Sequence, residues 1–119
     1  MTFQRRPAAR AKVRPRHETG KMNKTEAAYA RWLQSKVNDG TLAGWWFEGI
    51  KLRVADGTCW WSADFLVQGV DGSLEIHDVK GGPTEDDALV KSKVIATQFP
   101  FPVFEVRAGK GGWKIESVV

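Results

Sequence analysis

Two apolar runs joined by a glycine-containing turn constrain the fold of this chain more than any other feature. The turn is Gly69-Val70-Asp71-Gly72-Ser73. Asp-Gly supplies the positive φ that tight turns need, so the two runs predict a β-hairpin. The first run begins after the lone carboxylate Asp64, and the second ends in Asp78-Val79-Lys80. Because hairpin strands pair directly, these charged residues should lie next to each other in space.

The remaining patterns predict an α/β fold with a mixed sheet. Asn23 and Glu26 stand at capping-box spacing before apolar residues at helical spacing, so a helix should begin near Lys24 and end at Asn38-Asp39-Gly40. Thr84 should cap a second helix that runs to about Gln98. Apolar alternation and turn residues, including a turn at 55–58, predict strands at residues 45–54, 59–67, 74–80, 102–108 and 113–118.

The predicted order is a helix, three antiparallel strands, a second helix and two further strands. The third strand, the second helix and the fourth strand should form a right-handed parallel unit. We therefore expect a mixed sheet of about five strands flanked by two helices. In each adjacent tryptophan pair, one ring should face each side of this sheet, and a base-stacking platform is the alternative use for such rings.

Length and composition limit the classes of protein. The chain has 119 residues, of which 42% are hydrophobic, and this suits a single globular domain. Its one cysteine, Cys59, excludes an internal disulfide and a cysteine-based zinc site, which favours the cytoplasm. No apolar run approaches the roughly 20 residues of a membrane span, so we expect no membrane partner.

Positive charge is concentrated in residues 1–21, which we interpret as a basic arm preceding a domain at 22–119. The rest of the chain has more acids than bases. This asymmetry favours a polyanionic partner, most often nucleic acid; the alternative is a solubilising leader. Against the single acid Glu18, the arm holds Arg5, Arg6, Arg10, Lys12, Arg14, Arg16 and Lys21.

The combination of Glu26, Asp64 and Asp78-Val79-Lys80 on such elements resembles the PD-(D/E)XK nuclease superfamily. The segments at 63–65 and 78–81 are similar to small phage-type endonucleases, including endonuclease-I-like Holliday-junction resolvases. The resemblance covers about residues 24–106, and the chain has Ala63 where the family often has proline. It implies a restriction-endonuclease-like core and a metal-dependent endodeoxyribonuclease that acts in recombination on branched or otherwise structured DNA. If the chain is phage-encoded, it would work in the host cytoplasm.

The same residues suit phosphodiester hydrolysis on chemical grounds. Asp64 and Asp78, with the Val79 carbonyl, should hold Mg²⁺, with Mn²⁺ as a substitute, and activate a water against phosphorus. The alternative is a pair of ordinary acids at strand ends. Aspartate is depleted in strands, however, and Asp78 shares its side of the strand with apolar Leu74 and Ile76.

Two further catalytic candidates each have a structural alternative. Lys80 should orient the attacking water and stabilise phosphorane charge, or it forms a structural ion pair with Asp78. Glu26 is either a further metal ligand or the capping partner of Asn23. A metal set through Glu75 would need a bulge that shifts the register.

The partners follow from this chemistry. Lys91 and Lys93 on the second helix either contact a phosphate or belong to a solvated face. A homodimer would provide the two sites needed to cut two strands symmetrically. Two alternatives to an enzyme remain: a nucleic-acid-binding module without turnover, and a recruiting subunit of a phage or transposon DNA-processing complex.

Overall fold

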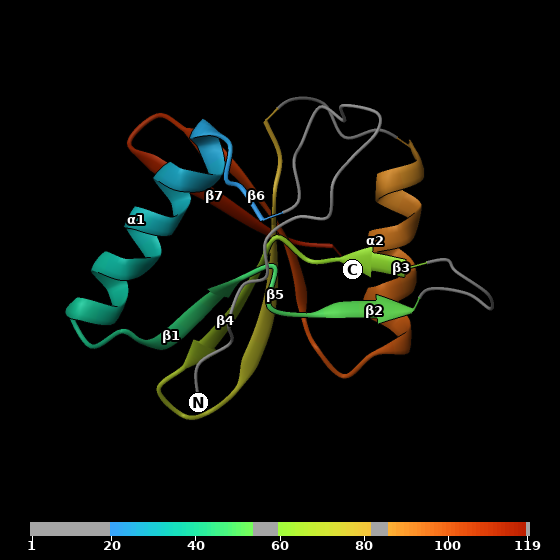
Figure 1. The fold of residues 1–119 in the computed structure, drawn as a ribbon, viewed down its shortest axis with the longest axis horizontal. Helices are drawn as coiled ribbons and strands as arrows, with labels where there is room; N and C mark the ends of the chain where they lie inside the picture. The colour runs from blue at the N-terminus through green and yellow to red at the C-terminus, as the bar shows by residue number, and fades with distance from the viewer. Residues whose placement is uncertain (1–19, 54–59, 82–85, 119) are drawn as a thin grey trace.

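A computed structural model describes residues 20–53, 60–81 and 86–118. It shows an α/β fold in which two helices flank a mixed five-stranded sheet (Figure 1). The predicted turn at 55–58 and the predicted cap Thr84 lie outside these residues. In chain order, the elements are α1 (Lys24–Asn38), β1 (Leu42–Phe47), β2 (Lys51–Arg53), β3 (Trp60–Ser62), β4 (Phe65–Gly69), β5 (Leu74–Val79), α2 (Asp86–Gln98), β6 (Val103–Gly109) and β7 (Gly112–Ser117).

The sheet has the strand order β1-β4-β5-β6-β7, and β2 and β3 form a separate antiparallel pair. The predicted hairpin is β4–β5, with Phe65 opposite His77. Strands β5 and β6 are parallel and connected through α2, as predicted. The remaining neighbours in the large sheet are antiparallel. The five-stranded mixed sheet with two helices is therefore confirmed.

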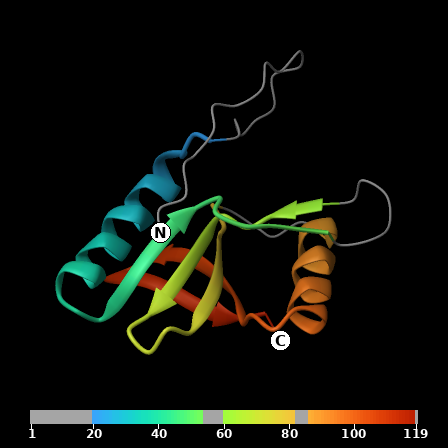
Figure 2. The same ribbon diagram turned by 60° about the horizontal axis from the view of Figure 1, so that its bottom comes forward.

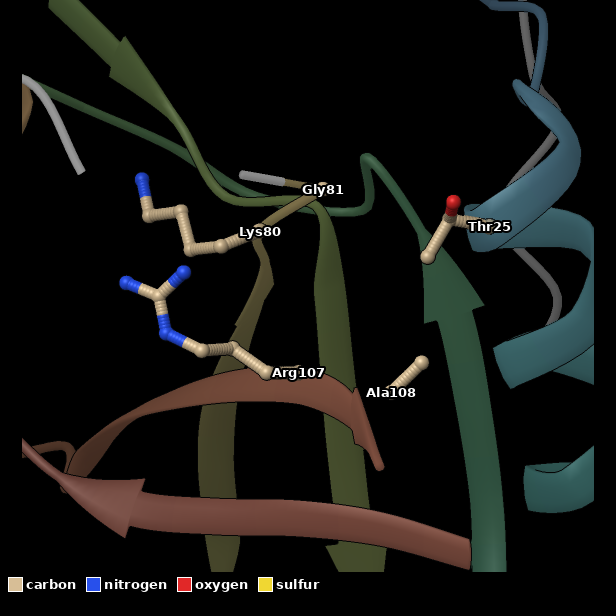
Figure 3. Close-up of a pocket in the computed structure, with 5 residues that line it drawn as sticks. All are labelled: Thr25, Lys80, Gly81, Arg107 and Ala108. Atoms are coloured by element: carbon tan, nitrogen blue, oxygen red, sulfur yellow. The ribbon is translucent and has the colours of Figure 1, made fainter. Parts of the chain in front are cut away.

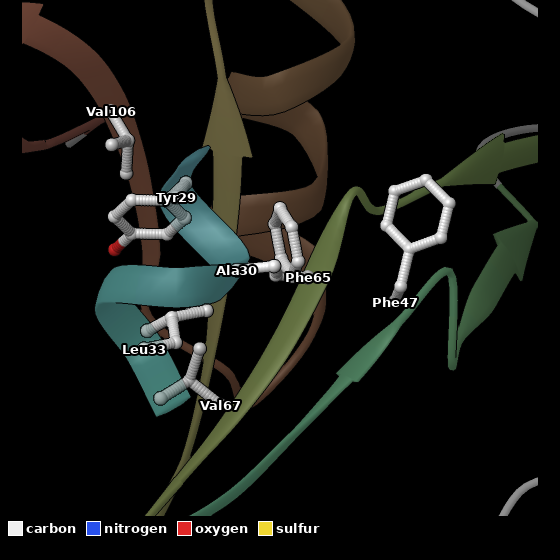
Figure 4. Close-up of a cluster of buried hydrophobic side chains, with 7 residues drawn as sticks. All are labelled: Tyr29, Ala30, Leu33, Phe47, Phe65, Val67 and Val106. Atoms are coloured by element: carbon white, nitrogen blue, oxygen red, sulfur yellow. The ribbon is translucent and has the colours of Figure 1, made fainter. Parts of the chain in front are cut away.

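Each helix covers a different face of the sheet, and each face has its own core (Figures 1 and 2). Figure 4 shows the α1 core, in which Tyr29 and Leu33 pack against Phe65 and Val67. Ile95 of α2 packs on the opposite face. The adjacent tryptophans divide between the two cores, because Trp45 packs in the first and Trp46 in the second. The prediction that paired rings face opposite sides is confirmed for this pair.

Two of the predicted strands, 45–54 and 59–67, were wrong as continuous elements. The first breaks between β1 and β2 at Glu48, whose φ of 51° lies in the left-handed region. Gly49 follows, and a Cβ there would stand 2.7 Å from the Cβ of Trp46, so the kink needs glycine. The second breaks between β3 and β4 at Ala63-Asp64. Both segments leave the main sheet at the same end and pair with each other as the β2–β3 hairpin.

Helix α1 begins as predicted, at Lys24 with Asn23 as its N-cap. The side chain of Asn23 accepts a hydrogen bond from the Glu26 N–H at 2.8 Å, and Glu26 accepts one from the Asn23 N–H at 2.9 Å. The chain before α1 is also bonded to the rest of the fold, because the Gly20 N–H donates to Glu48 Oε1 at 2.8 Å. Within the ranges described above, no helix is both long and apolar enough to span a membrane.

A buried polar chain connects α1 to β5. The Tyr29 hydroxyl lies 2.5 Å from His77 Nδ1, and His77 Nε2 lies 2.8 Å from Glu75 Oε1. Burial lowers the pKa of His77, so the ring is neutral above pH 7, and burial raises the pKa of Tyr29. His77 and Glu75 therefore face α1, on the side of β5 opposite Asp78, as strand alternation predicted.

We expect Tyr29→Phe to lower the free energy of unfolding by about 1–3 kcal/mol, because it leaves the buried His77 Nδ1 without its donor. Urea unfolding at pH 7.5 measures this change. The matched control is Gln34→Ala, which removes the exposed hydrogen bond from Trp45 at 3.0 Å and should change stability by about 0.5 kcal/mol or less. Equal effects of the two substitutions would contradict the expectation.

Candidate active site

The side chain of Asp64 pairs with β5 at the point where β4 starts, directly before Phe65. Strand β4 begins only at Phe65. Two residues earlier, the Ala63 N–H donates to the Ile50 carbonyl at 3.3 Å, on the side of the β2–β3 hairpin. The Val79 N–H of β5 therefore donates to Oδ2 of Asp64 at 2.9 Å, where a continuing β4 would have offered a carbonyl. This bond fixes the Asp64 carboxyl beside the last residue of β5.

Asp78 meets Asp64 at this position. Asp78 is 6% exposed and lies on the same side of β5 as buried Ile76. Its carboxyl hydrogen-bonds to that of Asp64, and its Oδ2 lies 2.7 Å from the Lys80 ammonium. The structure thus brings together two predicted metal ligands and the predicted catalytic lysine. The ion pair that we considered as the alternative role of Lys80 is present.

The Asp64 carboxyl holds its proton more tightly than an ordinary aspartate does. Burial raises the pKa of Asp64 to about 9, and the charge of Asp78, the hydrogen bond between the two groups and the charge of Glu26 add to the rise. The hydrogen bond from the Val79 N–H lowers the pKa of Asp64 and offsets part of this rise. A protonated Asp64 carboxyl can donate the hydrogen bond between the two side chains, whereas an ionised Asp64 carboxylate cannot.

The raised pKa of Asp64 predicts how stability changes with pH. Asp64 ionises near its ordinary pKa of 3.8 in the unfolded chain but only near 9 in the fold, so its contribution to stability is lost as pH rises through that window. Without divalent cations, we expect the melting temperature to fall between pH 7 and 9, where His77 stays neutral. Asp64→Asn should flatten this dependence, while exposed Glu116→Gln should follow the wild type. Parallel curves for all three proteins would contradict the assignment.

Glu26 serves the helix cap and also lies near the carboxyl pair. It is 4% exposed, its Oε1 accepts from the Asn23 N–H, and its charge contributes to the raised pKa of Asp64. Capping therefore does not require the side chain to turn away from Asp64. The cap is confirmed, and a role as a metal ligand stays a prediction.

An open pocket of about 260 Å³ adjoins Lys80 and contains a cation that the sequence interpretation missed. Thr25, Lys80, Gly81, Arg107 and Ala108 line it (Figure 3). Figure 3 shows Lys80, which directly follows β5, and Arg107 of β6 extending in the same direction, and this agrees with the pairing of Val79 with Val106. Arg107 lies 3.4 Å from Glu105. The pocket therefore presents two cations beside the carboxyl pair.

A sequence signal for Arg107 existed. Glu105-Val106-Arg107 repeats the acid, valine and base order of Asp78-Val79-Lys80, and the two triplets are side by side in parallel strands. Recognising it required the register between β5 and β6. Glu48 was missed for a different reason, because nothing local in the sequence marks it as the residue with a left-handed backbone beside Asp64.

Several predicted site residues are not brought to this position by the described structure. Lys93 is exposed on α2, and its role stays a prediction. The side chain of Lys91 lies outside the described residues. So do six predicted arm contacts: Arg5, Arg6, Arg10, Lys12, Arg14 and Arg16.

The donor set suits a hard cation but is not arranged as a finished metal site. Over residues 20–53, 60–81 and 92–118, no three His, Cys, Asp or Glu side chains are placed to hold a metal together. Two aspartate carboxyls and the Val79 carbonyl are nevertheless oxygen ligands of the type that Mg²⁺ binds. Comparison of the chain with protein-family models, curated proteins and solved structures gives no significant match. Function is therefore inferred from the geometry of this site.

Proposed function

We propose that this protein is a metal-dependent endonuclease that hydrolyses phosphodiester bonds in branched or otherwise structured DNA. One observation carries the proposal: two hydrogen-bonded, largely buried aspartates at a sheet end, with Lys80 on one of them and an open cationic pocket alongside. The raised pKa of the Asp64 carboxyl, held beside a second buried carboxyl, is costly for the fold and is a typical property of functional sites. The restriction-endonuclease-like assignment of the core is part of the same proposal.

Asp64, Asp78 and the Val79 carbonyl would hold Mg²⁺ or Mn²⁺, with Glu26 as a further candidate ligand. A cation bound there would supply a Lewis acid for activating water and neutralising phosphate charge. The donor chemistry fits, because every candidate atom is an oxygen and three of the four residues can be anionic. The positive charge of a bound cation would take the place of the proton on Asp64 and offset the repulsion between ionised carboxylates there.

Lys80 and Arg107 would position the substrate. Their side chains extend beside each other at the pocket, so a phosphate there could receive hydrogen bonds from both (Figure 3). When Asp78 turns to another partner, the ammonium of Lys80 is released from its ion pair to donate to the water or to phosphate oxygen. The guanidinium of Arg107 would hold the neighbouring oxygens. Phosphate contacts of this kind carry little sequence information, so DNA shape should dominate selectivity.

A panel of DNAs tests the proposal. Labelled four-way junctions, flaps, nicked duplexes, linear duplexes and single strands are incubated with Mg²⁺, Mn²⁺ or EDTA. We expect cleavage with either metal, greatest on branched substrates, and none with EDTA. Uncut DNA in every mixture would contradict the proposal.

The Lys80–Asp78 ion pair favours one alternative, a nucleic-acid-binding module without turnover, because the pair occupies a carboxyl that a cation would need. The same panel separates the two functions. Binding to the DNAs in a mobility-shift assay, without cleavage at any metal concentration, would support the module.

A further inference from the structure

The β2–β3 hairpin has an exposed face that the proposed active site does not use. On its inner side, Leu52 and Trp61 pack against the α2 core. Strand alternation therefore turns the other residues outward, and all of them are exposed. Trp60, at 42% exposed, is one of the few large hydrophobic side chains that the described structure leaves open to solvent. The outward residues are Lys51, Arg53, Trp60 and Ser62.

The outward face consists of an aromatic ring with two cations beside it. Arg53 is directly opposite Trp60 in the ladder, and its guanidinium carbon lies 5.2 Å from the ring centroid. The Lys51 ammonium lies 5.8 Å from the same ring. Both distances are in the range of cation–π interactions, so the indole has cationic neighbours while remaining exposed. Within residues 51–53 and 60–62 there is no acidic side chain to neutralise them.

Backbone hydrogen bonds connect the strands of this face to the segment that holds Asp64. The hairpin begins where the Ala63 N–H bonds to the Ile50 carbonyl and the Glu48 N–H bonds to the Asp64 carbonyl at 2.8 Å. Trp60 precedes Asp64 by four residues, which span at most about 14 Å. Stacked nucleotides advance about 3.4 Å per step, so a base on Trp60 would lie within about four nucleotides of a phosphate at Asp64.

We propose that Lys51, Arg53 and Trp60 bind an unpaired segment of a DNA strand, with a base stacked on Trp60 and phosphates held by the two cations. Aromatic rings combined with cations are how single strands are bound without sequence selection. An acidic peptide would need the cations but not the indole face, so the cluster fits nucleic acid better. Only the placement of this segment near the cut rests on the proposed function. The substrate would then be a junction or flap with unpaired bases beside the scissile phosphate.

Binding in EDTA tests the inference without turnover. A fluorescein-labelled oligothymidine and a duplex of the same length are titrated by fluorescence anisotropy at several salt concentrations. We expect Trp60→Ala to weaken oligothymidine binding by about tenfold or more and duplex binding much less, while leaving the salt slope unchanged. Trp60→Phe should restore most of the affinity, because it keeps an aromatic face. Melting curves confirm that both variants fold.

The cations should respond differently from the ring. Arg53→Gln should reduce the slope of log K against log salt by about 0.7, the value for losing one phosphate contact to a single strand. The matched control is Lys36→Gln, which removes an ammonium 5.4 Å from the Trp32 ring on α1 and should leave both affinity and slope unchanged.

Three results would overturn the inference: Trp60→Ala binding like the wild type, equal losses for oligothymidine and duplex, or a slope change with Arg53→Gln but no dependence on Trp60. The last result would indicate a general anion site of the kind that suits an acidic peptide. Failure of the nuclease proposal is recognisable separately. Trp60-dependent binding without Mg²⁺-dependent cleavage would refute the enzyme alone, whereas cleavage with Trp60-independent binding would refute this surface alone.

Discussion

Asp64→Asn and Asp78→Asn should each abolish Mg²⁺-dependent DNA cleavage without unfolding the protein. In the first variant, the amide oxygen can still accept from the Val79 N–H, and the amide nitrogen can donate to Asp78 in place of the protonated Asp64 carboxyl. The fold is thereby retained while an anionic ligand is lost. DNA binding should be unchanged or tighter, because neither substitution adds negative charge near phosphate.

Cleavage of a junction substrate and calorimetric titration with Mg²⁺ measure the two effects of these substitutions. The control is Asp71→Asn in the β4–β5 turn, an exposed carboxylate whose oxygen accepts from Ser73. It should cleave like the wild type. Retained Mg²⁺-dependent cleavage in both site variants would show that the carboxyl pair is structural.

Lys80→Ala should reduce turnover by about two or more orders of magnitude, as expected for the loss of a group that stabilises transition-state charge. Mg²⁺ binding should survive, because the Asp78 carboxyl is freed from its ion pair with Lys80 at 2.7 Å. Single-turnover cleavage and calorimetry separate these effects. Lys114→Ala, which alters an exposed cation on β7, serves as the control. Loss of Mg²⁺ binding with Lys80→Ala would instead mean that Lys80 mainly supports Asp78.

The features that the sequence predicted correctly depend on neighbouring residues. Asn23 and Glu26 form the expected capping box because both halves are three residues apart. The Asp71-Gly72 turn brings β4 and β5 together and so places Asp64 beside Asp78, and Gly72 has the positive φ of 90° that such a turn requires. The side of β5 on which Asp78 and Lys80 lie follows from strand alternation alone.

The features that escaped prediction depend on contacts between distant residues. The alternation of residues from Glu48 to Val54 satisfies a strand pattern. The chain nevertheless turns at Glu48, because the Trp46 side chain packs against Gly49 and in the core on the α2 side of the sheet. Arg107 joins the site only through the parallel register of β5 and β6. Periodicity describes one element at a time and therefore could not supply either relation.

The hydrogen bond from the Val79 N–H to Asp64 has a consequence for how so small a chain accommodates a reactive centre. In a continuous sheet, that N–H would be used by the next rung of the β4–β5 ladder, and the space beside it would be filled by backbone. Here the chain before β4 leaves the sheet, so one backbone hydrogen bond of the ladder is missing, and the Asp64 carboxyl accepts from the Val79 N–H in its place. The carboxyl pair is thus placed where one backbone hydrogen bond of the sheet is missing, and no added loop is needed to hold it. Its position is set by the same backbone pairing that holds the core together.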